Sequence, residues 1–195
     1  MITNLQIKSN LSLDELINDL SQLDTTALQY LISSLQKIKT EKEQESISEQ
    51  QSFWQFIEKI DWIQNNKQER LKPLVEALKD ASVSSINEFS EQLATVLNQL
   101  DGPEYYENLK SQANGVSADT FLYARCQVVA KGKTFFEEVL RHPEKMPAEA
   151  DFEGLLYVAR EAYERKTGRE YNFIPSFIYE SFFNQNLWKE KAIIL

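Results

Sequence analysis

Apolar residues recur at helical spacing in the first part of the chain. Two series of them are visible: Leu13, Leu16, Ile17 and Leu20, then Leu28, Leu31, Ile32, Leu35 and Ile38. Ser12 and Glu15 form a capping-box pattern before the first series, and Asp24 with Thr25 marks the start of the second. The pattern predicts a helical hairpin. Its leucine-rich face needs a cover, either from the rest of the chain or from a second copy.

The composition changes after this hairpin. Between residues 37 and 51 Lys and Glu dominate, and Ile47 is the one apolar residue after Ile38. Such a stretch buries too little apolar surface to order itself, so we expect a solvated helical extension or a linker that marks a domain boundary. A continuous helix is the alternative, because these residue types favour helix. We therefore expect residues 1–45 to form a hairpin with a charged linker, and residues 46–195 to form the main domain.

Helical spacing returns in the main domain. It predicts an aromatic-rich, largely buried helix over 53–63, a helix over 66–80 that contains Pro73, and a helix over 85–100 with Ser85 and Glu88 as a second capping box. Pro73 is expected to kink its helix or to lie in the first turn. Asp101-Gly102-Pro103 is expected to end the third helix, with glycine at positive φ.

The remainder of the chain continues the pattern. Short helices are predicted from Tyr105 to Asn114, from Ser117 as the cap, over 133–142, and from Phe152 to Lys166 with Gly168 as terminator. No alternating strand pattern occurs, so the expected fold is an all-α bundle of about eight helices with an N-terminal helical hairpin. The tail from Tyr171 carries seven aromatic residues and must pack on the domain body, on a second subunit or on another protein.

Charge and cysteine content narrow the function classes. The 195 residues include 21 Lys and Arg against 30 Asp and Glu, a formal net charge of −9. This balance opposes binding to nucleic acid or to an anionic membrane surface. The N-terminus lacks a signal-peptide pattern and no apolar run is long enough for a membrane span, so a cytoplasmic location is expected. Cys126 is the single cysteine, which excludes an intrachain disulfide and a multi-cysteine metal site.

Three stretches of the main domain resemble a known family. They are Phe53-Trp54 leading to Ile57, the run from Ser117 to Arg125 followed by Gly132 and Phe136, and the run from Phe152 to Tyr163. Together they are similar to the bacterial Domain of Unknown Function family 4240 over roughly residues 51–166. The resemblance places the family motif on Ser117, Asp119, Phe121, Tyr123, Arg125 and Gly132, with Ala118 where members have a second acid. It implies no activity.

Asp119, Tyr123 and Arg125 are the candidate ligand-binding residues, because all three fall on one predicted helix. Arg125 could clamp an anion in a bidentate manner while Asp119 or Tyr123 serves as an acid or base. The structural interpretation is favoured: Asp119 suits the positive end of the helix, and Arg125 could pair with an acid on a neighbouring helix. Cys126 is expected to be a buried, inert thiol.

Other chemistry has little support in the sequence. His142 lies in Arg-His-Pro-Glu at a predicted helix end, where a cation suits the helix dipole. The carboxylates between 137 and 153 match no metal-binding loop, and Lys131-Gly132-Lys133-Thr134 lacks the rest of a phosphate loop. We therefore expect no cofactor, no metal and no catalytic residues.

The sequence therefore favours an intracellular protein–protein interaction or regulatory module, with homodimerisation through the N-terminal hairpin. The alternative is a small enzyme or a binder of anionic ligands that uses Asp119, Tyr123 and Arg125.

Overall fold

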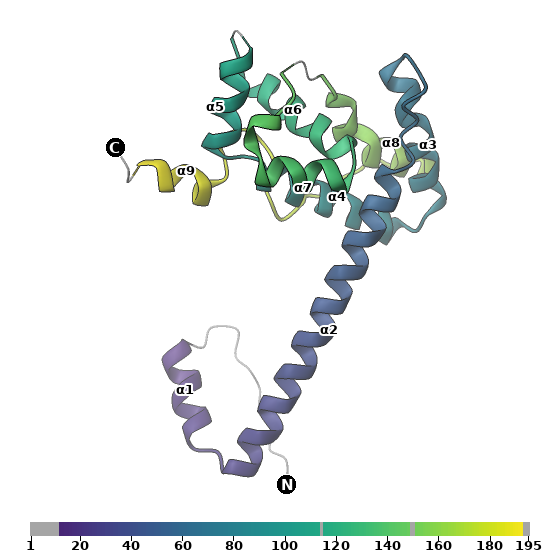
Figure 1. Ribbon diagram of the computed structural model, residues 1–195. Helices are drawn as coiled ribbons and strands as arrows, with labels where there is room; N and C mark the ends of the chain where they lie inside the picture. Colours follow the sequence, from purple (N-terminus) through teal and green to yellow (C-terminus); the bar gives the residue numbers. More distant parts are fainter. Residues whose placement is uncertain (1–11, 114, 149–150, 193–195) are drawn as a thin grey trace. The chain divides into compact units, whose positions relative to one another are not determined.

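The computed structural model describes residues 12–113, 115–148 and 151–192. Within these ranges it contains nine α-helices, two 3₁₀ helices and no β-strand (Figure 1), which confirms the predicted all-α fold. The chain divides into two compact units, 1–47 and 48–195. The helices are α1 (Leu13–Ser21), α2 (Thr25–Ile57), α3 (Lys67–Asp80), α4 (Val83–Gln99), α5 (Pro103–Gln112), α6 (Ala118–Ala130), α7 (Lys133–Arg141), η1 (Pro143–Lys145), η2 (Glu153–Tyr157), α8 (Val158–Thr167) and α9 (Gln185–Ala192).

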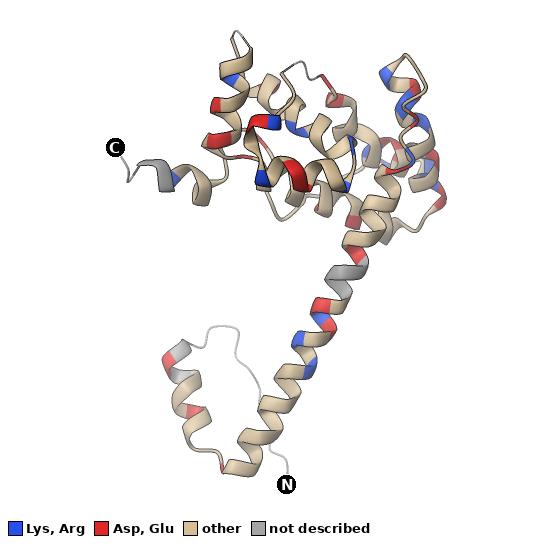
Figure 2. Ribbon diagram, viewed as in Figure 1, with Lys and Arg blue, Asp and Glu red and all other residues tan. Residues whose placement is uncertain are grey.

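The first unit is the predicted helical hairpin of α1 and the start of α2. Asp24 precedes α2, and its Oδ1 accepts a hydrogen bond from the backbone N–H of Ala27 at 2.8 Å, as expected for a capping residue. The charged stretch after Ile38 is helical, because α2 continues through it to Ile57, and of the alternatives that the sequence leaves open the helical one is confirmed. Lysines and acids four residues apart, such as Lys37 and Glu41 at 3.8 Å, support the exposed helix (Figure 2).

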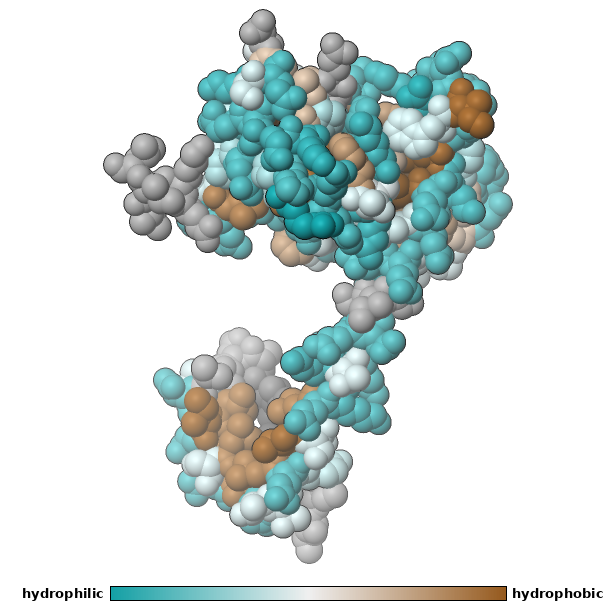
Figure 3. All heavy atoms as spheres, viewed as in Figure 1, coloured by the Kyte–Doolittle hydropathy of each residue, from teal (hydrophilic) through white to brown (hydrophobic). Residues whose placement is uncertain are grey.

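The hairpin has no buried core of its own among the described residues. None of the side chains described between residues 12 and 44 is buried. The large apolar side chains exposed here are Ile17 (56%), Tyr30 (72%), Ile32 (54%), Leu35 (63%) and Ile38 (49%). Apolar residues of the hairpin gather where α1 and α2 face each other (Figure 3).

The second unit holds the hydrophobic core, and α6 is its most buried helix. Eight residues of α6 are buried, among them Phe121, Cys126 and Val128. The end of α2 contributes the Phe53 and Trp54 rings that the sequence predicts to be buried. Phe53 lies 5.1 Å from Phe89 of α4, and Trp54 lies 5.3 Å from Phe136 of α7 (ring centroids). This core packs α4, α6, α7 and α8 around the residues of the family motif.

Several helix ends match the sequence prediction. Ser117 caps α6, with its hydroxyl accepting the N–H of Thr120 at 3.0 Å. Gly168 ends α8 in the left-handed region at φ 68°, where glycine carries no side-chain penalty. The predicted helix from Phe152 is split, since 153–157 form the 3₁₀ helix η2 before α8 begins.

Four local predictions differ from the structure in whole or in part. Ser82, not Ser85, caps α4, because the Ser82 hydroxyl accepts the N–H of Ser85 at 3.0 Å. Gly102 has φ −135° rather than a positive φ, because it is the N-cap that precedes Pro103 at the first position of α5. Pro73 lies well inside α3, so of its two expected positions the first turn is excluded.

The fourth concerns the aromatic helix predicted over 53–63. The α2 helix ends at Ile57, and the residues beyond it turn toward α3. Trp62 and Ile63 are 41% and 90% exposed. The apolar run therefore continues beyond the end of the helix, and its last members are not buried as predicted.

Candidate functional site

The α6 helix places the three candidate residues in different environments. Asp119 is exposed in the first turn, Tyr123 is half-buried, and Arg125 is fully buried. Arg125 forms its contacts with α4 and with the C-terminal tail. A clamp that presents all three side chains to one ligand is therefore not formed by the described structure, and binding by these residues remains a prediction.

Tyr123 belongs to a polar cluster at the surface of α6. A hydrogen bond with Glu153 of η2, together with partial burial, raises the pKa of Tyr123 to about 12. The nearby Asp119 carboxylate acts in the same direction. Tyr123 therefore keeps its proton at neutral pH, which makes it a hydrogen-bond donor rather than a base.

Glu153 also borders a cavity of about 560 Å³ between the start of α3 and η2. Lys67 and Asp151 form an ion pair at 2.5 Å among its lining residues. Because Lys67 is already paired with Asp151, this cavity presents little positive charge to an anionic ligand.

Arg125 instead organises the interior of the second unit. Its Nη1 donates to the Leu97 carbonyl at 3.0 Å, its Nη2 donates to Ser181 Oγ at 2.8 Å, and its guanidinium lies 4.7 Å from the centre of the Phe121 ring. Burial lowers the pKa of Arg125, and the Asp101 carboxylate at 4.0 Å opposes that change. The predicted pairing of Arg125 with an acid on a neighbouring element is thus only a long contact. The short bonds are to a carbonyl and a hydroxyl.

Asp101 binds the tail through backbone groups. Its carboxylate accepts the N–H groups of Phe182, Phe183 and Asn184, each at 2.8 Å. Phe182 takes φ 73°, in the left-handed region that non-glycine residues rarely adopt, and this bend directs the three consecutive N–H groups at one carboxylate. Three charge-assisted hydrogen bonds satisfy a carboxylate that is fully buried.

Further contacts extend the attachment of the tail. Ser181 donates to the Ala118 carbonyl at 2.7 Å, and Asn184 Nδ2 donates to the Asn98 carbonyl at 2.8 Å. The Phe182 ring lies 5.2 Å from Tyr106 and 5.1 Å from Trp188 of α9. Of the three covers considered for the aromatic tail, the body of its own domain is the one it packs on.

The remaining candidates have structural surroundings. His142 is exposed, with Nδ1 3.2 Å from Glu144. Cys126 is buried, and burial raises the pKa of its thiol to about 12, so the nucleophilic thiolate is suppressed. The described part of the chain contains no group of three or more His, Cys, Asp or Glu side chains that could hold a metal ion. None of its helices is long and apolar enough to cross a membrane.

Comparison with known proteins identifies the family. No curated protein and no solved structure matches the chain. The model of the family described as "Protein of unknown function (DUF4240)" matches residues 49–165, close to the range of the resemblance seen in the sequence. The N-terminal hairpin and the C-terminal tail lie outside this match, although the tail is bound by Asp101 and Arg125 from within it. The chain belongs to the DUF4240 family.

Proposed function

We propose that this protein is an interaction module that self-associates through its N-terminal hairpin. The observation that supports the proposal most directly is the absence of any buried side chain among those described between residues 12 and 44. Two helices that bury so little are marginal alone, because chains below about 40 residues need metals, disulfides or association to become stable. Association with a second hairpin supplies the missing burial.

The spacing of the apolar residues suits a second copy. Leu28, Leu31, Leu35 and Ile38 follow one another at intervals of three, four and three residues, the pattern of a coiled-coil seam. Two hairpins paired about a twofold axis would form a four-helix arrangement in which these residues face one another. The charged stretch of α2 carries both signs, so like-charge repulsion does not oppose the pairing.

Two pairs of substitutions test the proposal in the full chain. Leu35→Glu with Ile38→Glu introduces two charges at positions that are 63% and 49% exposed in the single chain. These exchanges leave the single chain's own packing almost unaffected, but they bury charge in the proposed dimer. We expect a dimer for the wild type and a monomer for this variant, measured by light scattering after size exclusion.

A matched control adds the same charge elsewhere on the helix. Gln29→Glu with Gln36→Glu also replaces two exposed side chains of α2, about 100° or more away from the apolar seam. This control should remain a dimer. A wild type of monomeric mass, or equal masses for the two variants, would rule out the hairpin as the association surface.

The alternative of ligand binding by Asp119, Tyr123 and Arg125 has weaker support. Arg125 is fully buried beneath the tail, so it meets no external anion unless the tail leaves.

A further inference from the structure

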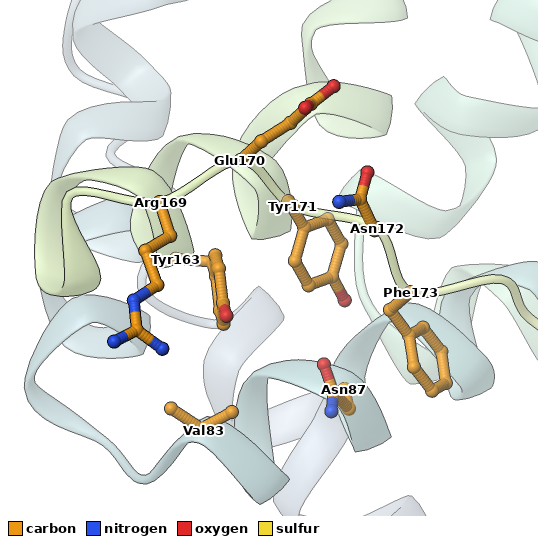
Figure 4. A pocket seen from close by; sticks show the side chains of 8 residues that line it. All are labelled: Val83, Asn87, Tyr163, Arg169, Glu170, Tyr171, Asn172 and Phe173. Atoms are coloured by element: carbon orange, nitrogen blue, oxygen red, sulfur yellow. The ribbon is translucent and has the colours of Figure 1, made fainter.

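A second cavity lies between α4, α8 and the segment that follows Gly168. Its volume is about 470 Å³, within the range of small-molecule sites. Val83 and Asn87 line it from the first turns of α4, Tyr163 lines it from α8, and residues 169–173 complete it (Figure 4). The left-handed turn at Gly168 brings this segment back over α4.

Three aromatic rings form one wall of this cavity. The Tyr163 and Tyr171 rings lie 5.0 Å apart, and the Phe173 ring is stacked 6.2 Å from Tyr171. The Tyr171 hydroxyl donates to Ser90 Oγ at 2.9 Å, which fixes the central ring. The Tyr163 and Tyr171 rings are tilted by 48° to each other, and together they offer an apolar, aromatic surface against which another ring can pack.

Arg169 supplies an unpaired cation to the same cavity. Neighbouring Arg165 bonds to Glu76 at 3.1 Å and Lys166 bonds to the Lys79 carbonyl at 3.0 Å. Among the described residues, the Arg169 guanidinium has no such partner. The side chain of Arg169 extends toward the side of Val83, whereas that of Glu170 points the other way (Figure 4). Glu170 also belongs to the lining, but no ion pair joins it to Arg169 in the described structure, so the positive charge of Arg169 is not paired there.

Asn87 adds a hydrogen-bond acceptor at the base of the cavity. Its Oδ1 is buried and receives no hydrogen bond from the described protein atoms. A buried acceptor without a donor is unfavourable, so an Asn87 side chain that rotates its Oδ1 into the cavity would gain a hydrogen bond from a donor group on a ligand. A small molecule that suits this cavity would carry an anionic group for Arg169, a flat ring for the aromatic wall and a hydroxyl or amine for Asn87.

We propose that this cavity binds small aromatic carboxylates that carry a ring hydroxyl. The carboxylate pairs with Arg169, the ring packs on Tyr163 and Tyr171, and the hydroxyl donates toward Asn87. An arginine fork matches the geometry of a carboxylate, which gives preference for an acid over a neutral molecule of the same shape. This binding site lies in the second unit and does not depend on association of the hairpins.

The test uses 4-hydroxybenzoate as the probe and 4-hydroxybenzamide as its neutral match. Binding to the full chain is followed by shifts of the backbone amide NMR signals of residues 83–87 and 169–173. We expect 4-hydroxybenzoate to bind at least about tenfold more tightly than 4-hydroxybenzamide. Cyclohexanecarboxylate, which lacks the aromatic ring, should bind more weakly than 4-hydroxybenzoate.

Two variants assign the effect to the cavity. Arg169→Gln should reduce the affinity for 4-hydroxybenzoate to that for the amide, with the thermal midpoint unchanged because Arg169 is exposed. Arg160→Gln removes the same charge from an exposed position of α8 that does not line the cavity, and it should leave binding unchanged. The proposal is overturned if the acid and amide bind equally, if neither shifts these signals, or if Arg169→Gln binds like the wild type.

Discussion

At the scale of single residues, the buried charged side chains of Asp101 and Arg125 attach the C-terminal tail to the domain. Both side chains are fully buried. Asp101 accepts three hydrogen bonds from the tail, and Arg125 donates one to Ser181 of the tail and one to the Leu97 carbonyl of α4. A buried carboxylate is tolerated when its oxygens are satisfied, and here three backbone N–H groups do so. Removing one charged partner leaves the other without compensation, which is the costly case for buried ions.

Asp101→Asn tests this arrangement. The amide nitrogen of asparagine would face a backbone N–H that now bonds to Oδ1 or Oδ2, so one or more donors lose their acceptor. We expect the free energy of unfolding to fall by about 3 kcal/mol, measured by urea denaturation. Asp119→Asn makes the same exchange at an exposed position of α6 and should change the free energy of unfolding by less than about 1 kcal/mol. Equal effects of the two substitutions would contradict the assigned role of Asp101.

The buried thiol of Cys126 should make the free energy of unfolding depend on pH in the alkaline range. Burial raises its thiol pKa from 9.0 to about 12, so the folded state holds this proton more tightly than the unfolded state. The resulting stabilisation is fully present below about pH 9 and is lost as the pH rises toward 12. The stability difference between the wild type and Cys126→Ala should therefore shrink above about pH 9, by roughly 1.4 kcal/mol per pH unit. Denaturation at a series of pH values measures it, and a difference that stays constant would refute a buried, protonated thiol.

Sequence patterns identify residues whose role is local. Ser117 and Gly168 were predictable because a helix cap depends on neighbours only a few residues away. The local pattern predicts only that Asp101 belongs to a helix stop, and it predicts no role for Ser181. Their partners lie about 80 and 60 residues away in sequence, and no local spacing encodes such contacts.

At the scale of elements, the tail from 171 to 184 behaves as an integral part of the second unit. It belongs to no helix, yet its backbone is bonded to side chains of α4 and of the α4–α5 connection. Glu91 accepts the Ser176 N–H at 2.9 Å, and Asn98 donates to the Ile178 carbonyl at 3.0 Å. These hydrogen bonds satisfy backbone groups of the tail that a helix or a strand would otherwise satisfy by backbone–backbone hydrogen bonds.

Hydrogen exchange tests the attachment of the tail. The amides of Phe182, Phe183 and Asn184 should exchange slowly because each donates to Asp101, whereas the Phe177 amide, which has no protein acceptor in the described structure, should exchange fast. Asp101→Asn should accelerate the three amides more than those of α6. Fast exchange of all tail amides in the wild type would show that the tail is not held as described.

Element boundaries show where periodicity is insufficient. The positions of α6 and α7 and the end of α8 follow from apolar spacing and caps, but α2 passes through the charged stretch without apolar support. Helix propensity and lysine–glutamate pairs at four-residue spacing outweighed the low hydrophobicity there. Likewise, both Ser82 and Ser85 are suitable caps, and only the structure distinguishes them.

At the scale of the whole molecule, the chain consists of a unit with a substantial core and a unit without one among the described residues. All the core side chains lie at or after Phe53. The family match begins at residue 49, so the hairpin is an addition to the family domain. A helical pair that exposes leucines and isoleucines is stable when another apolar surface covers it, and this is the physical basis of the proposal that it self-associates.

Sedimentation equilibrium of the full chain over a wide range of concentrations tests this claim most directly. A single chain has a mass of 22.7 kDa. The account predicts twice this mass at high concentration, a shift toward the single-chain mass on dilution, and the single-chain mass throughout for Leu35→Glu with Ile38→Glu. A wild type that stays at 22.7 kDa at every concentration would contradict self-association through the hairpin.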